Sequence, residues 1–261
     1  MVTLEHLDQS VTIHEGELTS YKVKGYEFMH QKGEPGWGNT DTEMFPVIGP
    51  TAGAEYRVQV PKGNAVLDQH GHLRELPYVL EVQEKQRAVY TKEYKAGTLV
   101  SNSKYPKRSR APKLIWPFSF RFEKKFHLGN EGLKITFAVS GERDMPYMLG
   151  YHPAFRLRSP DARVVGGGKS TSLAEVMAAG DRALEIPETE DLVLEDEKSI
   201  GVSTRGFGNF MLWSPTSNMI CVEPVTFYPY AVEQTALHEG FRYLDQPEAT
   251  FEVSLIPNIK S

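Results

Sequence analysis

Two residues in the second half of the sequence, His152 and Glu223, have the types needed for acid–base catalysis. His152 precedes Pro153, and a residue before proline is held in an extended backbone, which fixes the direction of its side chain. Glu223 directly follows the apolar run 220–222, where a carboxylate costs free energy unless it has partners or a function. Because histidine and glutamate commonly serve as general acid and base, the two residues are predicted to act together. Taken singly, a satisfied core histidine and an exposed glutamate are the alternatives.

Two segments suggest phosphate binding, but neither is convincing. Residues 166–171 resemble the end of a phosphate-binding loop, yet the full pattern requires a glycine five residues before Gly168, where the sequence has Arg163. The segment 104–113 carries five basic residues interrupted by prolines. In an acidic protein such a run is typical of a solvated loop. The sequence therefore does not favour nucleotide binding.

A pair of histidines, His70 and His72, suggests a metal site. On a strand, residues two apart share a face, so both imidazoles could approach one ion. A zinc site needs at least a third protein ligand, and no nearby carboxylate stands at a suggestive spacing. The sequence therefore predicts no metal and no other cofactor.

Alternation of apolar and polar residues predicts the elements that position these side chains. Apolar residues at 118, 120 and 122 and at 133, 135, 137 and 139 flank a glycine-containing turn at 129–132. Alternation is typical of a half-buried antiparallel strand, so the two segments are predicted to form a hairpin. Further strands are expected at 11–14, 18–23, 27–31, 76–83, 87–94, 148–157, 219–226 and 250–256. Short helices are expected only at 172–179 and 231–238. This arrangement predicts an all-β fold, a large antiparallel β-sandwich, formed by one domain over residues 1–261.

The composition sets limits on partners and location. A 40% hydrophobic and 11% aromatic content is sufficient for a packed core. The net charge of −5 offers no attraction to nucleic acid or anionic lipid. The single cysteine, Cys221, is compatible with a reducing compartment. The sequence shows neither a signal peptide's apolar run nor the roughly 20 apolar residues of a membrane helix. We therefore expect a cytoplasmic protein with no nucleic-acid or membrane partner.

Four segments place polar or ionisable residues in aromatic, strand-like surroundings. They read Phe-Pro-Val-Ile-Gly at 45–49, His-Gly-His-Leu-Arg at 70–74, Gly-Tyr-His-Pro-Ala-Phe at 150–155 and Glu-Pro at 223–224. In this order they are similar to motifs of the aldose 1-epimerase (galactose mutarotase-like) family, and most of all to its branch of short bacterial proteins of uncertain sugar specificity. The resemblance spans nearly the whole chain.

The resemblance implies a galactose mutarotase-like sandwich with an open sugar cleft. It also implies an isomerase of carbohydrate metabolism that interconverts the anomers of an aldose or a sugar phosphate. Glu223 would be the general base and His152 the general acid, without a redox cofactor or a covalent intermediate. His70 and Arg74 would contact the substrate. The aromatic side chains of Trp37 and Phe227 are candidates for stacking on a sugar face.

One departure from the motifs concerns specificity: Pro50 stands where the short branch often has an arginine. Two other functions remain possible on the same fold. A non-catalytic sugar-binding protein would not need a matched acid and base. A carbohydrate lyase or hydrolase would need a second carboxylate near the first. A monomer or a homodimer is expected in each case.

Overall fold

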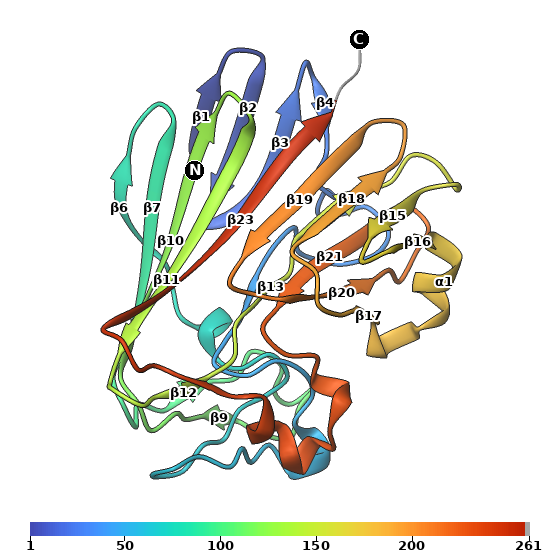
Figure 1. Cartoon of the computed structure of the whole chain (residues 1–261). Helices are drawn as coiled ribbons and strands as arrows, with labels where there is room; N and C mark the ends of the chain where they lie inside the picture. Colours follow the sequence, from blue (N-terminus) through green and yellow to red (C-terminus); the bar gives the residue numbers. More distant parts are fainter. Residues whose placement is uncertain (259–261) are drawn as a thin grey trace.

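The computed structural model describes residues 1–258, and antiparallel strands dominate it (Figure 1). The largest sheet has nine strands. In spatial order they are β16 (Lys169–Ser172), β15 (Arg163–Gly166), β18 (Asp191–Glu195), β19 (Ser199–Arg205), β23 (Glu248–Asn258), β11 (Gly132–Gly141), β10 (Phe120–Gly129), β7 (Arg87–Tyr94) and β6 (Val79–Gln83).

A second sheet packs against the large one and carries Glu223 on one of its strands. Its strands lie in the order β17 (Leu184–Ile186), β20 (Asn209–Trp213), β21 (Met219–Val225), β13 (Gly150–Tyr151) and β5 (Glu43–Met44), with β14 (Ala154–Arg156) also paired to β21. Aromatic rings fill the space between the two sheets. The rings of Phe137 on β11 and Tyr151 on β13, for example, lie 5.1 Å apart. The predicted β-sandwich is therefore confirmed.

Smaller sheets complete the fold. A meander of four strands comprises β1 (Val2–His6), β2 (Gln9–His14), β3 (Glu17–Val23) and β4 (Tyr26–Glu27). Two-stranded ladders join β8 (Val100–Ser101) to β9 (Lys113–Leu114) and β12 (Pro146–Tyr147) to β22 (Arg242–Tyr243). Short 3₁₀ helices lie at Ala52–Ala54, Leu73–Glu75, Gly180–Arg182, Pro229–Ala231 and Gln234–Gly240.

The predicted hairpin forms as β10 and β11, in continuous register from Phe120 opposite Gly141 to Gly129 opposite Gly132. Alternate side chains of both strands are buried, as their apolar period requires. The predicted strand at 148–157 is instead split into β13 and β14, because Pro153 lacks the N–H that a continuous ladder needs. The sequence also missed β1, whose side chains alternate between buried and exposed.

The only α-helix among residues 1–258 is α1 (Leu173–Ala178), within the predicted segment 172–179. The Ser172 side chain accepts a hydrogen bond from the Glu175 N–H, and Glu175 accepts one from the Ser172 N–H in return. This reciprocal cap satisfies two backbone donors at the start of the helix. The second predicted helix, at 231–238, is 3₁₀ rather than α. None of the helices in this part of the chain is long and apolar enough to cross a membrane.

Candidate active site

A cavity of about 1240 Å³ opens at one end of the sandwich. Five of the six residues predicted to form the site line it. They are Glu223, His152, His70, Arg74 and Trp37. Residues from distant parts of the sequence therefore converge on one hollow, as the ordered motifs suggested.

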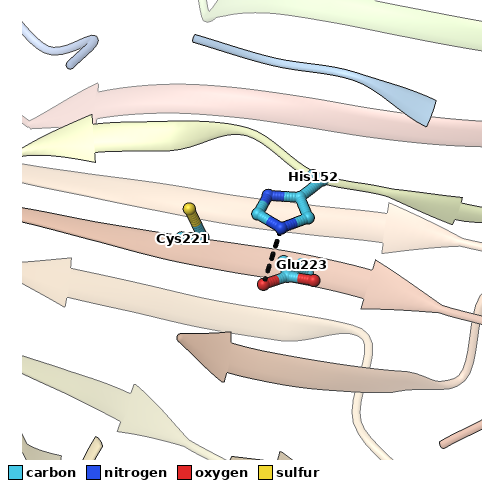
Figure 2. A group of neighbouring side chains, drawn as sticks. All are labelled: His152, Cys221 and Glu223. Carbon is cyan, nitrogen blue, oxygen red and sulfur yellow. Dashed lines mark ion pairs between the residues drawn. The ribbon is translucent and has the colours of Figure 1, made fainter. Parts of the chain in front are cut away.

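Glu223 and His152 lie next to each other in the wall of this cavity. Glu223 lies on β21 and is 2% exposed, whereas His152 follows β13 and is 7% exposed. His152 Nε2 lies 3.4 Å from Glu223 Oε1 (Figure 2). The backbone of His152 is fixed by reciprocal hydrogen bonds with Thr42, of 2.8 Å from the His152 N–H and 3.3 Å to the His152 carbonyl. Both groups are therefore held in position by the sheet rather than by a mobile loop.

Two tryptophans hold the imidazole of His152. The Trp37 ring stacks on it at a centroid distance of 4.2 Å, and the Trp213 ring meets it edge-on at 5.9 Å. The backbone N–H of Trp37 in turn donates to Met219 Sδ at 3.1 Å. Trp37 thus packs on the predicted acid and also presents an aromatic surface to the cavity.

Burial changes the proton affinity of both catalytic candidates. It raises the pKa of Glu223 well above its ordinary value, while the positive charge of Arg74 acts in the opposite direction. Burial also lowers the pKa of His152 to about 3, and Arg74 lowers this pKa further in the same direction. A carboxylate with a raised pKa is a stronger base, and an imidazolium with a lowered pKa is a stronger acid. In the free protein the same shifts favour the protonated form of Glu223 and the neutral form of the His152 ring, so the ionised forms that act as base and acid are the less populated ones.

Arg74 is the positively charged residue that acts on the pKa of both Glu223 and His152. It lies in the 3₁₀ turn Leu73–Glu75 and lines the cavity. Its Nε and Nη2 atoms are buried and make no hydrogen bond to any residue between 1 and 258. A guanidinium has five N–H donors in a fixed fork, so Arg74 has donors available for a ligand's oxygen atoms.

The position of Arg74 leads to a prediction about pH dependence. Its charge lowers the pKa of both Glu223 and His152, so Arg74→Met should raise both. Both limbs of the profile of kcat/KM against pH should then move to higher pH. Arg74→Lys keeps the charge and should move them less. Profiles that coincide for the wild type and the methionine variant would contradict this electrostatic role.

His70 lines the cavity, and one of its ring nitrogens accepts a hydrogen bond from the backbone. Its Nδ1 accepts a hydrogen bond of 3.2 Å from the N–H of Gly49, so the ring proton resides on Nε2. Burial holds the pKa of His70 well below its usual value, and the charges of Arg74 and His152 act in the same direction. The ring lies 6.1 Å from that of His152. The Nε2 of His70 lies 3.2 Å from the side-chain nitrogen of Gln69, so a sugar oxygen would have to displace this amide to accept from the imidazole N–H.

The segments 45–49 and 70–74 pack against each other at Gly71. The His70 carbonyl accepts from the N–H of Phe45 at 3.2 Å, and the N–H of Leu73 donates to the Phe45 carbonyl at 3.2 Å. A Cβ at Gly71 would lie 2.0 Å from the Phe45 carbonyl oxygen, and Gly71 has a φ of +78°. Only glycine permits this approach, which explains why the glycine follows His70.

The two histidines of the suspected metal pair lie in different surroundings. His70 has a left-handed backbone with φ of +70°, so the segment is a turn and not the strand that would align both rings. His72 does not line the cavity; its ring packs in the core at 4.5 Å from Tyr94 and 5.7 Å from Phe120. The premise that His70 and His72 share one face is therefore wrong.

The prediction for Phe227 is also corrected. Phe227 is not among the residues that line the cavity, and its ring packs against the backbone of Gly240. The ring of Tyr230, three residues later, lines the cavity instead. The 3₁₀ turn Pro229–Ala231 decides which ring faces inward, and the aromatic composition of the segment does not reveal this.

Sequence reasoning missed several charged residues of the cavity wall. Lys104 and Arg108 belong to the basic run that was predicted to be a solvated loop, yet both line the cavity. Lys104 Nζ lies 3.3 Å from Asp68 Oδ1. The other missed ionisable residues of the wall are Glu15, Glu17, Asp41, Glu43, Asp68, Glu75, Tyr78, Lys92, Asp181, Arg182 and Tyr230. The concentration of basic residues at 104–113 was the one signal for any of them.

A buried ionic cluster lies beneath the cavity. Lys124, on the inner face of β10, is fully buried, with Nζ 2.7 Å from Asp41 Oδ2 and 2.6 Å from Glu43 Oε1. The Tyr151 hydroxyl also donates to Asp41 Oδ2, at 2.7 Å. Both carboxylates therefore compensate the buried positive charge of Lys124. They also anchor the start of β5 to the opposite sheet.

The chain is similar to known proteins in sequence and in fold. The family model for aldose 1-epimerase matches residues 1–242. The plasmid-encoded protein LacX of Lactococcus lactis subsp. lactis is 25% identical over an alignment that covers 94% of this chain and 92% of LacX. A galactose mutarotase-like protein from Lactobacillus casei has a similar structure, with a TM-score of 0.76, 19% identity and coverage of 99% of this chain and 100% of that chain. A galactose mutarotase related enzyme from Lactobacillus acidophilus gives a TM-score of 0.74, with 20% identity and 99% coverage of both chains.

Proposed function

Because the chain belongs to the aldose 1-epimerase family, we propose that it interconverts the α and β anomers of an aldose or a sugar phosphate by acid–base ring opening and closure. The observation that carries this proposal is the pair of His152 and Glu223, 3.4 Å apart in the wall of the cavity. A protein that only binds a sugar has no need for a buried acid and base with opposed pKa shifts.

The reaction requires one proton to leave the sugar and another to enter it. Glu223 takes the proton of the anomeric hydroxyl while His152 gives a proton to the ring oxygen, and the bond between the anomeric carbon and the ring oxygen breaks. The open aldehyde then turns about its bond to the next carbon. The ring closes on the other face of the carbonyl as the two protons return. The bound sugar would be oriented by Arg74, whose Nε and Nη2 have no partner among residues 1–258, and by His70, which lines the same cavity.

Separate roles for the two histidines give a second prediction. His152→Asn should lower kcat more than it raises KM, because an acid acts in the transition state. His70→Asn should affect both constants, because a positioning contact is also made in the ground state. Steady-state kinetics of the two variants, with thermal melting to check the fold, measure the difference. Equal losses confined to KM would refute this division.

The test of the function is also a test of specificity. Freshly dissolved α-anomers, free and 6-phosphorylated, are followed by polarimetry and by NMR exchange. Catalysed approach to anomeric equilibrium is expected with at least one sugar of the panel. A protein that binds a sugar without accelerating its mutarotation would instead be the non-catalytic binder.

Pro50 leads to an expectation for this panel. It lines the cavity and has neither a side-chain donor nor a backbone N–H. We therefore expect glucose and galactose to be poor substrates, and Pro50→Arg to fold normally because the position is only half-buried. Efficient turnover of both sugars by the wild type would show that Pro50 has no part in specificity.

A further inference from the structure

Within residues 1–258, one group of side chains has the composition of a metal site. A ring nitrogen of His152, the sulfur of Cys221 and a carboxylate oxygen of Glu223 all lie within 4.8 Å of one another. Cys221 and Glu223 are two residues apart on β21 and therefore point to the same face of the sheet, with His152 above them (Figure 2). All three residues are at least nine-tenths buried.

We propose that His152, Cys221 and Glu223 form a binding site for a thiophilic divalent cation such as Zn²⁺, and that occupation of this site switches off the acid–base pair. The inhibitory effect rests on the proposed function, whereas cation binding does not.

Imidazole nitrogen, thiolate sulfur and carboxylate oxygen are the ligands that Zn²⁺ prefers, at about 2.0–2.3 Å from the ion. In a tetrahedron of that size the ligand atoms are roughly 3.2–3.8 Å apart. The His152 Nε2–Glu223 Oε1 distance of 3.4 Å already lies in this range. The Cys221 sulfur lies within 4.8 Å of both the His152 nitrogen and the Glu223 oxygen. Movements of about 1 Å would therefore bring it to the separation that a tetrahedral site requires.

The cavity gives the cation a route to the site. His152 and Glu223 line the cavity, so an ion can arrive from that side, and its fourth position would face the cavity. Cys221 lies deeper, in a small apolar cluster with Ala154 and Met219.

Cation binding would remove both catalytic functions in one step. The Cys221 thiol releases its proton to solvent as the sulfur–metal bond forms, with no change of oxidation state. The same ion engages the lone pairs of Glu223 and His152. Glu223 can then no longer accept the sugar's proton, and His152 can no longer carry the proton for the ring oxygen.

The site can be tested without any measurement of activity. Co²⁺ titrated into the metal-free full-length protein reports a thiolate ligand by its sulfur-to-cobalt charge-transfer absorption in the near ultraviolet. The wild type should show a saturable band at one Co²⁺ per chain, and Zn²⁺ should abolish it. Cys221→Ser should lack the band. Met145→Leu, which removes a buried sulfur that does not line the cavity, should keep it.

Inhibition supplies the second measurement. Zn²⁺ should inhibit mutarotation by the wild type and by Met145→Leu, whereas Cys221→Ser should need at least about tenfold more Zn²⁺, because loss of even an outer partner of a ligand costs 10–100-fold in metal affinity. Cys221→Ala replaces the serine variant if a buried hydroxyl prevents folding. Absence of the cobalt band in the wild type, or equal zinc sensitivity of the wild type and the cysteine variant, would overturn the proposal. The cobalt result stands even if no sugar in the panel is a substrate.

Discussion

Replacement of Glu223 by glutamine is expected to slow anomer interconversion by about 10²–10⁴-fold, the usual contribution of a general acid or base. Glutamine has nearly the same shape, but its amide cannot take the proton of the anomeric hydroxyl. The burial that raises the pKa of Glu223 also means that an uncharged side chain is tolerated there. We therefore expect thermal melting to be unchanged or raised while the polarimetric rate falls.

A matched control is available on the same sheet. Glu185 on β17 pairs with Met211, and Met211 pairs with Glu223 on the other side, so all three residues lie in one row across the strands. Glu185 is half-buried but does not line the cavity. Glu185→Gln should therefore retain the wild-type rate. If Glu223→Gln melted normally and kept more than half of that rate, Glu223 would not be the base.

Lys124→Met is expected to have the largest effect on stability, a loss of about 3–5 kcal/mol in the free energy of unfolding, as when one partner of a buried ion pair is removed. The methionine has a similar length but leaves Asp41 and Glu43 in the interior without their cation. Chemical denaturation measures the loss. Lys125→Met is the control, because Lys125 is partly exposed on the other face of β10 and its ion pair with Glu123 spans 3.5 Å. A surface pair of this kind contributes about 0–1 kcal/mol.

The loss caused by Lys124→Met should grow with pH. Burial raises the pKa of Asp41 to about 6 even with Lys124 present, and removal of the lysine takes away an interaction that lowers it. A carboxyl group whose pKa is higher in the folded state binds more protons there, so the free energy of unfolding falls as the pH rises from about 4 through the folded pKa. The variant should thus be closest to the wild type near pH 4–5, by the same linkage. A deficit that is independent of pH would show that lost packing, not charge, is responsible.

The sequence by itself determined the class of fold, and it singled out His152 and Glu223, which the structure brings together in the cavity wall. Alternation of apolar and polar residues in β10 and β11, broken only at Lys124, predicted the hairpin, because only one face of each strand is buried. The proline after His152 and the apolar run before Glu223 drew attention to these two polar residues. A polar group in apolar surroundings costs free energy, which suggested that they have a function. The order of the motifs then supplied the family, which the match over residues 1–242 confirmed.

Only the tertiary structure decided which side chains meet. The register of β20, β21 and β14 places Cys221 beside the catalytic pair, and the left-handed turn at His70 sends His72 into the core. Lys124 interrupts the alternation of its strand, and its partners lie about 80 residues away in sequence. Local patterns specify which face of a strand is buried. They contain no information about the strand that will lie opposite, because that depends on pairing between distant segments.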